Sequence, residues 1–369
     1  MIKIVQVVSD SNIGGAGRYL LNYLKYYDRT CYDVTVIVPE GSLLCEFVQQ
    51  YSEVHLVEAP FMADKSFDKK CVKYLKRLFK EIKPDILHTH ASLSARIAGR
   101  LAKVPCIVAT RHCIEPMYSP IKAAILGFIN NRLCDYYIAV AEAVAQNLRD
   151  GGISLDKIKT IYNGVEPIRT VLPEAVRLEK TTYGIKDNDF VFGVFARLEK
   201  VKGHRYFLKA ARELKRAGYR AKFLIVGDGS LLNELKDKAK SLGISDDVIF
   251  TGYVKDTTTL LNATDVNVIS SESEAMSLAI LEAMSVGKPS IATLTGGNPE
   301  IVKNGINGYL TGVADSTSLA EAMIKIMSNE TLYHEMALNA RKMYEEKFGA
   351  KIMVDNLEKF YKEVSGDVY

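Results

Sequence analysis

Short apolar runs rich in β-branched residues alternate with helical patterns in the first part of the chain. These runs lie at 2–8, 33–38, 84–88, 106–110 and 135–140. Between them, apolar residues recur at the spacing of one helix face. Strands that alternate with helices are typical of βαβ units, so we expect a doubly wound parallel sheet here.

A second series of the same kind follows. Its predicted strands are 190–195, 222–226, 248–250, 266–269 and 290–292, and its predicted helices are 203–216, 230–242, 278–286, 315–328, 331–346 and 349–364. Between the two series, Asn163-Gly164 followed by Pro167 is typical of a turn and marks the domain junction. We therefore expect an α/β protein of two Rossmann-like parallel-sheet domains, 1–166 and 167–348, that face a cleft.

Composition narrows the classes of function. The chain has 369 residues, 48% of them hydrophobic, which is enough for two domains with a core each. A formal net charge of +4 is too small to indicate a nucleic-acid partner. No run of eighteen apolar residues predicts a membrane span. The six scattered cysteines lack Cys-x-x-Cys spacing and indicate reduced thiols in a cytoplasmic protein.

The most informative polar pattern is a pair of glutamates eight residues apart, Glu274 and Glu282. An apolar strand precedes them, and the helix that carries Glu282 ends at Gly287 and Pro289. Both acids can therefore face the crevice at the carboxyl end of the sheet, where open α/β sheets bind ligands. Carboxylates accept hydrogen bonds from paired sugar hydroxyls, although helix glutamates are more often solvated surface charges.

The same helix begins with groups that favour an anion. The backbone N–H groups of Ser277, Leu278 and Ala279 open it and suit a phosphate. In another strand-to-helix loop, Arg197 and Lys202 supply a guanidinium fork and a point charge that suit a diphosphate. Each cation alone is more often a surface charge.

Two glycine turns are weaker signals. Gly227-Asp-Gly229 joins a strand to a helix and lets the backbone approach a ligand, although a plain tight turn explains it too. Gly14-Gly15-Ala-Gly17 opens the first helix and, with Glu40, is an alternative dinucleotide loop. Its Gly-x-Gly-x-x-Gly register fails, which argues against a dinucleotide.

Two further patterns raise the question of a metal. His88 and His90 share one face of a strand, but no third ligand has suitable spacing. Asp187-Asn-Asp189 has the form of an Asp-x-Asp motif, yet it lies in a polar loop that a turn explains. We expect no metal and no cofactor.

These motifs resemble those of retaining glycosyltransferases of family 4, which have the GT-B fold, over essentially the whole chain. The most specific stretch runs from Glu274 to Gly308, where Glu-x7-Glu-Ala-Met precedes Gly-Lys-Pro, Gly-Gly-x-x-Glu-Ile-Val and Asn-Gly-x-x-Gly. Arg197-Leu-x-x-x-Lys202-Gly and Tyr-Asn-Gly-Val match as well. The family often has Glu-Gly-Phe-Gly-Leu where this chain has Glu274-Ala-Met-Ser-Leu278, which leaves the donor sugar open.

The resemblance implies that the first domain binds the acceptor and that the second binds a UDP- or GDP-sugar donor. It implies that the last helix, within 349–369, packs back on the first domain. Its donor-binding residues are Gly15, Arg197, Lys202, Gly227, Glu274, Ser277, Leu278, Ala279 and Glu282. Glu274 would contact the transferred sugar, Glu282 the ribose, and the two cations the diphosphate, while Gly15 would close onto the donor phosphate.

The implied reaction moves a hexose or an N-acetylhexosamine to a hydroxyl of a glycan, a lipid-linked glycan or a small molecule. The hydroxyl attacks on the face that the diphosphate leaves, and the leaving phosphate oxygen takes the proton. The catalytic residues would be His112, Glu274, Arg197 and Lys202, and His90 and Arg111 would line the acceptor site. An epimerase of the same fold and a non-catalytic nucleotide-sugar binder are the alternatives.

The segment 65–83 is predicted to be a basic amphipathic helix. It carries eight Lys and Arg residues against two acids, and it has an apolar stripe. The plain interpretation is a helix on the sheet with a solvated face. The alternative is a peripheral contact with the inner face of the membrane, which suits a lipid-linked acceptor.

Overall fold

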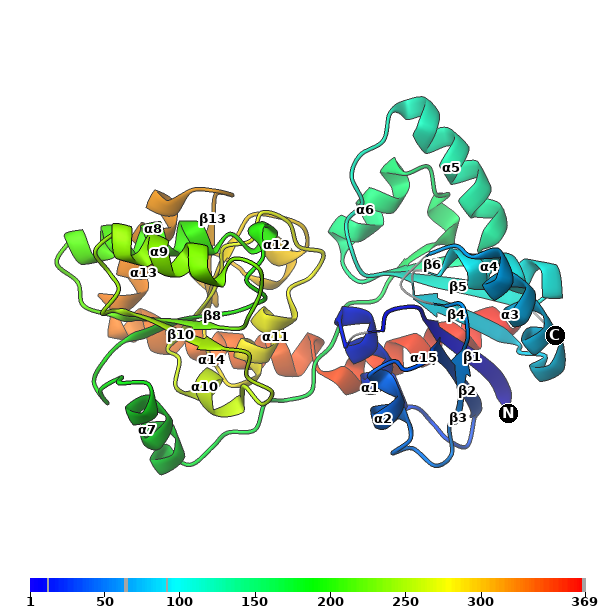
Figure 1. The fold of residues 1–369 in the computed structure, drawn as a ribbon, viewed down its shortest axis with the longest axis horizontal. Helices are drawn as coiled ribbons and strands as arrows, with labels where there is room; N and C mark the ends of the chain where they lie inside the picture. The colour runs from blue at the N-terminus through cyan, green and yellow to red at the C-terminus, as the bar shows by residue number, and fades with distance from the viewer. Residues whose placement is uncertain (12, 63–65, 91, 367–369) are drawn as a thin grey trace. The chain divides into compact units, whose positions relative to one another are not determined.

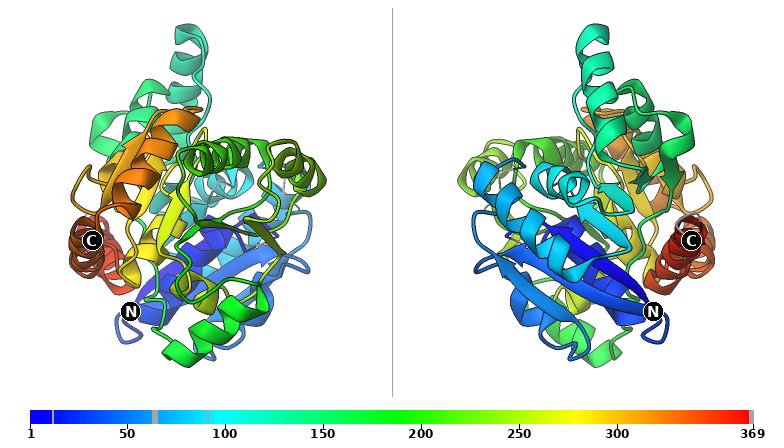
Figure 2. Two further views of the ribbon diagram at one scale, coloured as in Figure 1. Left: turned by 90° about the vertical axis from the view of Figure 1, so that its left-hand side faces the viewer. Right: turned by 90° about the vertical axis from the view of Figure 1, so that its right-hand side faces the viewer.

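The computed structural model describes residues 1–11, 13–62, 66–90 and 92–366. The chain divides into two compact units. The first consists of Met1–Gly164 together with Ala350–Tyr369, and the second consists of Val165–Gly349. Each unit is a parallel sheet covered by helices on both faces (Figures 1 and 2). The expectation of two Rossmann-like α/β domains is therefore confirmed.

The first unit contains a seven-stranded parallel sheet in the order β3-β2-β1-β4-β5-β6-β7. Its strands are β1 (Ile2–Val8), β2 (Tyr32–Pro39), β3 (His55–Ala59), β4 (Ile86–His90), β5 (Cys106–Arg111), β6 (Tyr136–Ala139) and β7 (Ile158–Thr160). The sequence pattern did not predict β3 and β7, because these edge strands are short and partly exposed. The strand order reverses between β1 and β4, which is where such sheets bind ligands.

The helices of the first unit cover both faces of this sheet. They are α1 (Gly15–Tyr26), α2 (Leu44–Val48), α3 (Lys69–Ile82), α4 (Leu93–Ala102), α5 (Pro120–Leu133), α6 (Glu142–Asp150), the 3-10 turn η1 (Leu155–Lys157) and α15 (Ala350–Gly366). The first and last of these, α1 and α15, pack together and share one core with β1 and β2. On the opposite face, α3 and α4 lie side by side (Figure 1).

The second unit contains a six-stranded parallel sheet in the order β10-β9-β8-β11-β12-β13. Its strands are β8 (Val191–Phe195), β9 (Lys222–Val226), β10 (Val248–Gly252), β11 (Val266–Ile269), β12 (Ser290–Thr293) and β13 (Gly308–Thr311). The edge strand β13 was not predicted. The order reverses between β8 and β11, so the loops that follow these two strands leave the sheet at its switch point.

The helices of the second unit are α7 (Pro173–Thr182), the 3-10 turn η2 (Lys200–Lys202), α8 (His204–Arg216), α9 (Leu232–Ser241), α10 (Thr258–Asn262), α11 (Leu278–Ser285), α12 (Asn298–Ile301), α13 (Ser316–Met327) and α14 (Glu330–Lys347). One core joins the sheet to α8, α9 and α13. The opposite face carries α7 and α10 (Figure 1).

In the described part of the chain, no helix is both long and apolar enough to cross a membrane.

The basic helix begins later than predicted. The Asp68 side chain accepts hydrogen bonds from the N–H groups of Lys70 and Cys71, at 2.7 and 2.9 Å, so Asp68 is the N-cap of α3. Lys83 ends the helix in the left-handed conformation. The predicted start at Lys65 lies outside the described residues. Within residues 66–83, the basic segment is helical from Lys69 to Ile82.

Candidate active site

In the second unit, Lys202 and Glu274 form an ion pair. Lys202 Nζ lies 2.6 Å from Glu274 Oε1, and the two side chains are 23% and 11% exposed. Lys202 ends η2 after β8, whereas Glu274 lies in the loop between β11 and α11. Ser271 Oγ donates a second hydrogen bond, of 2.6 Å, to the same carboxylate oxygen. Two loops distant in sequence thus bring a cation and an acid together at the switch point.

Close backbone packing holds these two loops together. Gly203 has a φ of 65°, and a β-carbon there would lie 2.0 Å from the Ser270 carbonyl oxygen. The Glu272 N–H donates to the Val201 carbonyl over 2.7 Å. Ser270 Oγ donates to the Lys202 carbonyl over 3.1 Å. Only glycine suits position 203, because the site requires both a left-handed backbone and a close approach.

Arg197 lies where the chain leaves β8, at the start of the same loop. Its side chain is exposed. Among the residues that the structure describes, its guanidinium has no hydrogen bond or ion pair. Arg197 can therefore engage an anion without breaking a contact, whereas Lys202 must exchange part of its interaction with Glu274.

The glycine turn after β9 supports this loop. Gly227 has a φ of 143°, and a β-carbon there would lie 2.2 Å from the Ala196 carbonyl oxygen. Its N–H donates to the Gly252 carbonyl over 3.0 Å. The backbone that closely approaches Gly227 is thus that of Ala196, whereas the sequence pattern suggested that a ligand would approach it. Gly227 supports the backbone next to Arg197, and its direct contact with a donor stays a prediction.

The amino end of α11 follows Glu274 in the same loop. Ser277 is the N-cap and is buried, and Leu278 and Ala279 are the first two helical residues. The first backbone bond of the helix runs from the Ile280 N–H to the Ser277 carbonyl over 3.2 Å. The amide groups of Leu278 and Ala279 precede it, so they project from the positive end of the helix dipole. This end of α11 can hold a phosphate group.

Glu282 lies one helical turn beyond Leu278 on α11 and is half-buried. Residues four apart share a helix face, so its side chain lies on the same face as Leu278. Its backbone carbonyl accepts a hydrogen bond of 2.6 Å from Ser285 Oγ. The structure therefore places the two glutamates as the sequence pattern predicted, one in the loop and one on the helix.

In the first unit, three histidine rings stack at the carboxyl ends of β4 and β5. The rings of His88 and His90 are 4.6 Å apart between centroids, and those of His90 and His112 are 5.1 Å apart. The ring of Tyr19, from α1, packs edge-on against His112 with centroids 5.4 Å apart. His88 and His90 are buried. Side chains from β4 and α1 thus pack against one imidazole, that of His112.

A hydrogen-bond chain fixes which nitrogen of each ring carries the proton. Gln6 Nε2 donates to Tyr361 Oη over 2.8 Å, so Gln6 Oε1 accepts from His90 Nε2 over 3.1 Å. The bare Nδ1 of neutral His90 then accepts from His112 Nε2 over 2.8 Å. In neutral His112 the proton is therefore on Nε2, and Nδ1 is an acceptor. That Nδ1 is buried and has no hydrogen-bond partner among the described residues.

Burial keeps these rings neutral at physiological pH. Burial, together with the smaller effect of the positive charge of Arg111, lowers the pKa of His112 to about 4. Burial also lowers the pKa of His88 to about 3 and that of His90 well below the ordinary value. Desolvation disfavours the charged imidazolium. A neutral His112 can accept a hydrogen bond from a hydroxyl of a bound ligand.

The remaining predicted residues of the first unit lie at loop and helix ends. Gly15 is the exposed first residue of α1, and a β-carbon there would meet nothing within 4 Å. Arg111 ends β5 and forms an ion pair with Glu115. The Glu115 N–H donates to Asn147 Oδ1 over 2.9 Å, which ties this loop to α6. Gly15 thus has open space in front of it, whereas Arg111 is already engaged.

Gln6, Tyr361 and Ser271 were not anticipated as members of these sites. Gln6 is a fully buried amide within an apolar strand, and that polar residue is the signal that could have indicated a network. Tyr361 lies 355 residues further along the chain, so no local pattern could indicate their contact. His88, considered at first for a metal, uses both ring nitrogens for hydrogen bonds to Tyr361 and Thr110, at 2.5 and 2.6 Å.

Among the residues that the structure describes, no group of three or more His, Cys, Asp or Glu side chains could hold a metal ion. In the Asp187-Asn-Asp189 segment, Asp189 Oδ2 accepts a hydrogen bond of 2.8 Å from the Lys186 N–H. That bond closes the polar turn between α7 and β8.

Two family models cover most of the chain. The model of the group 1 glycosyl transferases matches residues 176–343, and that of glycosyltransferase family 4 matches residues 13–169. The chain is also 30% identical to the UDP-Gal:alpha-D-GlcNAc-diphosphoundecaprenol alpha-1,3-galactosyltransferase of Escherichia coli, over 98% of this chain and 96% of that protein. It is 29% identical to the N-acetyl-alpha-D-glucosaminyl L-malate synthase of Bacillus anthracis, over 77% and 76% of the two chains.

Solved structures show the same fold. The Anabaena protein HepE, in complex with UDP, superposes with a TM-score of 0.86 at 23% identity and covers 98% of this chain and 100% of its own. The resemblance that the motifs indicated is confirmed by the family models and by the full-length relative. This chain belongs to the glycosyltransferases of family 4, and its two parallel-sheet domains are those of the GT-B fold.

Proposed function

We propose that this glycosyltransferase moves a hexose or an N-acetylhexosamine from a UDP- or GDP-sugar to an acceptor hydroxyl, with retention at the anomeric carbon. The second unit binds the donor, and the first unit binds the acceptor. The acceptor is a glycan, a lipid-linked glycan or a small molecule in glycan assembly. The observation that carries this proposal is the pairing of Lys202 with Glu274 beside the amino end of α11.

The negative charge of the donor diphosphate suits the two cations of this site, Arg197 and Lys202. Arg197 is exposed and unengaged among the described residues, and Lys202 is held 2.6 Å from Glu274. When a diphosphate binds, Lys202 can contact it while Glu274 turns to accept sugar hydroxyls. The developing negative charge on the leaving diphosphate is then stabilised by two cations that are already in place.

The amino end of α11 supports the same assignment. The amide groups of Leu278 and Ala279 add a positive helix end for a phosphate. Glu282, one turn further on, accepts the ribose hydroxyls. An acid on each side of an anion site matches a nucleoside diphosphate that carries sugars at both ends.

We further propose that the reaction follows a front-face path. The acceptor hydroxyl attacks on the side from which the diphosphate departs, and the departing phosphate oxygen accepts the proton. No strong protein base is needed, which agrees with the lowered pKa of His112, about 4. We assign the bare Nδ1 of His112, which has no hydrogen-bond partner among the described residues, as an acceptor for a ligand hydroxyl.

The relatives support UDP-sugars as the first donors to examine. The Escherichia coli relative is named for UDP-Gal and for a diphosphoundecaprenol-linked acceptor, and HepE was solved with UDP. For this chain the donor base, the sugar and a lipid-linked acceptor are proposals. No metal or cofactor is included in them. Location in the cytoplasm, with peripheral contact through α3, is likewise proposed.

A donor panel tests this function. The protein is incubated with UDP-glucose, UDP-galactose, UDP-N-acetylglucosamine and GDP-mannose, and with acceptors that carry GlcNAc on a lipid diphosphate or on a simple alcohol. We expect transfer from one donor, and proton NMR of the product should show an α-anomer from an α-linked donor. A β-anomer would refute retention, and donor binding without transfer or hydrolysis would refute catalysis.

A further inference from the structure

Helix α5 in the first unit has its small side chains inside and its large apolar side chains outside. It runs over Pro120–Leu133 and stands at the edge of its unit (Figures 1 and 2). Ala123 and Gly127 are its buried residues. An ordinary surface helix buries its large apolar residues and exposes its polar ones. This arrangement is reversed, so the sheet does not explain the apolar composition of α5.

The inner contact requires small residues. A β-carbon at Gly127 would lie 2.4 Å from the Gly152 carbonyl oxygen. Gly152 has a φ of 81°, and a β-carbon at Gly152 would lie 2.8 Å from the Ala123 carbonyl oxygen. The helix backbone therefore lies directly against the turn after α6. No space remains on this side for a large residue, and the side that carries large residues is fixed toward solvent.

The outer side forms a stripe that we call the α5 stripe. Its members are Met117, Ile121, Ile125, Phe128 and Ile129, which are 86%, 76%, 56%, 61% and 46% exposed. Ile121, Ile125 and Ile129 recur at intervals of four residues within α5, so they follow one side of the helix axis, and Met117 lies in the segment that precedes the helix. Monomeric proteins rarely leave such a contiguous apolar surface uncovered without a binding role.

Positive charge borders the α5 stripe. The segment 116–133 contains Lys122 and Arg132 and no Asp or Glu. Lys122 Nζ lies 4.2 Å from the centre of the Tyr118 ring, and Arg132 Cζ lies 3.6 Å from that of Phe128. Cations that lie over aromatic rings at an apolar edge suit the boundary between lipid head groups and acyl chains, where anionic lipids attract them.

We propose that the α5 stripe inserts into the surface of an anionic lipid bilayer. A helix of 14 residues is about 21 Å long, which is too short to span a bilayer but suits one that lies in the interface. The contact would keep the enzyme next to membrane-bound acceptors if the proposed function holds. The surface itself does not depend on that function.

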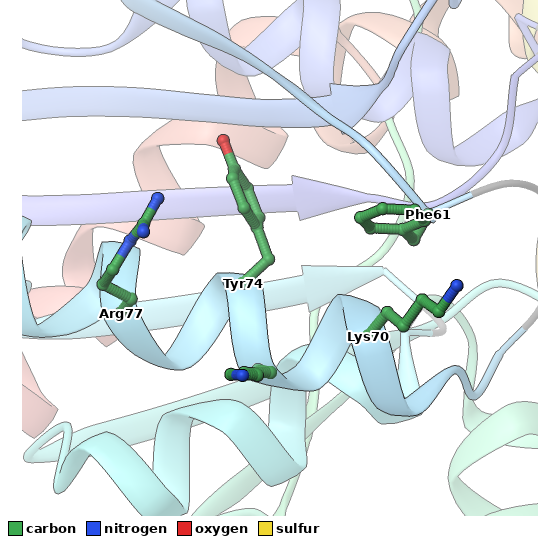
Figure 3. A pocket seen from close by; sticks show the side chains of 5 residues that line it. Phe61, Lys70, Tyr74 and Arg77 are labelled. Atoms are coloured by element: carbon green, nitrogen blue, oxygen red, sulfur yellow. The ribbon is translucent and has the colours of Figure 1, made fainter.

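The basic helix α3 is the competing surface, and it lacks an apolar stripe of this kind. Its own apolar residues, Cys71, Leu75 and Phe79, are buried in the unit. Its outer side has a hollow of about 370 Å³. Figure 3 shows both cationic and aromatic side chains around this hollow. They are Phe61, Lys70, Lys73, Tyr74 and Arg77. This helix can add attraction to anionic lipids, but the inserted part is α5.

The absence of tryptophan from the chain allows a direct test. Phe128→Trp places a single fluorophore in the α5 stripe, and Leu338→Trp places one at a side chain on α14 that is 73% exposed. With phosphatidylglycerol vesicles we expect a blue shift and quenching by brominated lipids for Phe128→Trp, and no change for Leu338→Trp. No shift at Phe128→Trp, or an equal shift at Leu338→Trp, would overturn the proposal.

Co-sedimentation gives a second measurement. The double variant Ile125→Ser with Phe128→Ser should bind phosphatidylglycerol vesicles at least tenfold more weakly than the wild type, and Leu338→Ser should bind as the wild type. Unchanged circular dichroism melting shows that the variants are folded. Lys122→Gln with Arg132→Gln should lower binding to anionic vesicles and reduce its salt dependence.

Four outcomes would contradict the proposal. The first is that the wild type fails to bind the vesicles. The second is that the Ile125→Ser, Phe128→Ser double variant binds as tightly as the wild type. In the third, Lys73→Gln with Arg77→Gln in α3 abolishes binding, whereas the double variant retains it. If light scattering shows a wild-type dimer that the double variant dissociates, a second copy of the chain covers the stripe, and the proposal is wrong.

Discussion

Glu274 holds the ammonium group of Lys202 at 2.6 Å, although the two residues lie 72 positions apart in the sequence. In the free enzyme each charge compensates the other, so neither is left unpaired in a partly buried position. A bound diphosphate would compete with Glu274 for Lys202. In the proposed reaction, Lys202 would contact the leaving group and Glu274 would contact the sugar.

Replacing Lys202 by Ala should lower kcat by on the order of 10²-fold, because the leaving diphosphate loses a preorganised cation. Lys200→Ala is the matched control, since Lys200 is an exposed lysine two positions earlier in η2. Steady-state kinetics with the best donor measure both variants. Equal turnover of the Lys202→Ala variant and the wild type would remove Lys202 from the reaction.

Gly203→Ala should destabilise the second unit more than Gly184→Ala does. The two glycines have similar φ values, 65° and 67°, so each alanine incurs about 1–2 kcal/mol for a left-handed backbone. Only at Gly203 does the β-carbon meet a carbonyl, 2.0 Å away, whereas nothing lies within 4 Å at Gly184. Urea unfolding measures the free energy of unfolding of both variants. Equal losses would show that the contact with Ser270 is unimportant.

The free energy of unfolding should fall as the pH drops below about 6.5. Burial lowers the pKa of His88 to about 3 and those of His112 and His204 to about 4, and it also lowers that of His90. The unfolded chain then binds protons that the folded chain excludes, so stability is greatest above pH 6.5. Each histidine adds a slope of about 1.4 kcal/mol per pH unit until its folded pKa is reached.

Urea titrations at pH 7.5, 6 and 5 measure this slope. His88→Asn should be less stable at pH 7.5, because a packed ring is lost, but its stability should depend less steeply on pH. A wild-type stability that stays constant from pH 7.5 to pH 5 would show that the buried rings do not resist protonation.

Gln6→Leu should mix the tautomers of His112, because His90 Nε2 loses the carbonyl oxygen that keeps it protonated. Nitrogen-15 NMR distinguishes a protonated from a bare Nδ1. Gln6→Glu retains an acceptor at this position and should restore the single tautomer and most of the turnover. If His112 keeps one tautomer in Gln6→Leu, the hydrogen-bond chain does not control it.

Much of the fold follows from local pattern. Interior strands such as β9 and β11 are buried on both faces, so they appear as continuous apolar runs and were predicted with their observed bounds. Edge strands such as β3 and β13 are short and partly exposed, and they leave no such run. The start of α3 depended on the capping bonds of one side chain, Asp68.

The candidate site shows the same division. The sequence placed Arg197, Lys202, Glu274 and the start of α11 in loops after parallel strands, because strand, loop and helix succeed one another along the chain. It could not show that Lys202 and Glu274 touch, or that Gln6 and Tyr361 govern a histidine. Those contacts join segments between 72 and 355 positions apart.

The amino-acid sequence by itself determined the family, the two parallel sheets and the residues that lie at their carboxyl ends, since these depend on motifs and on the period of short segments. Only the tertiary structure decided which side chains meet, which proton pattern His112 has and which side of α5 faces solvent. The physical reason is that packing, hydrogen bonding and burial depend on neighbours in space, and the fold brings those neighbours from distant parts of the chain.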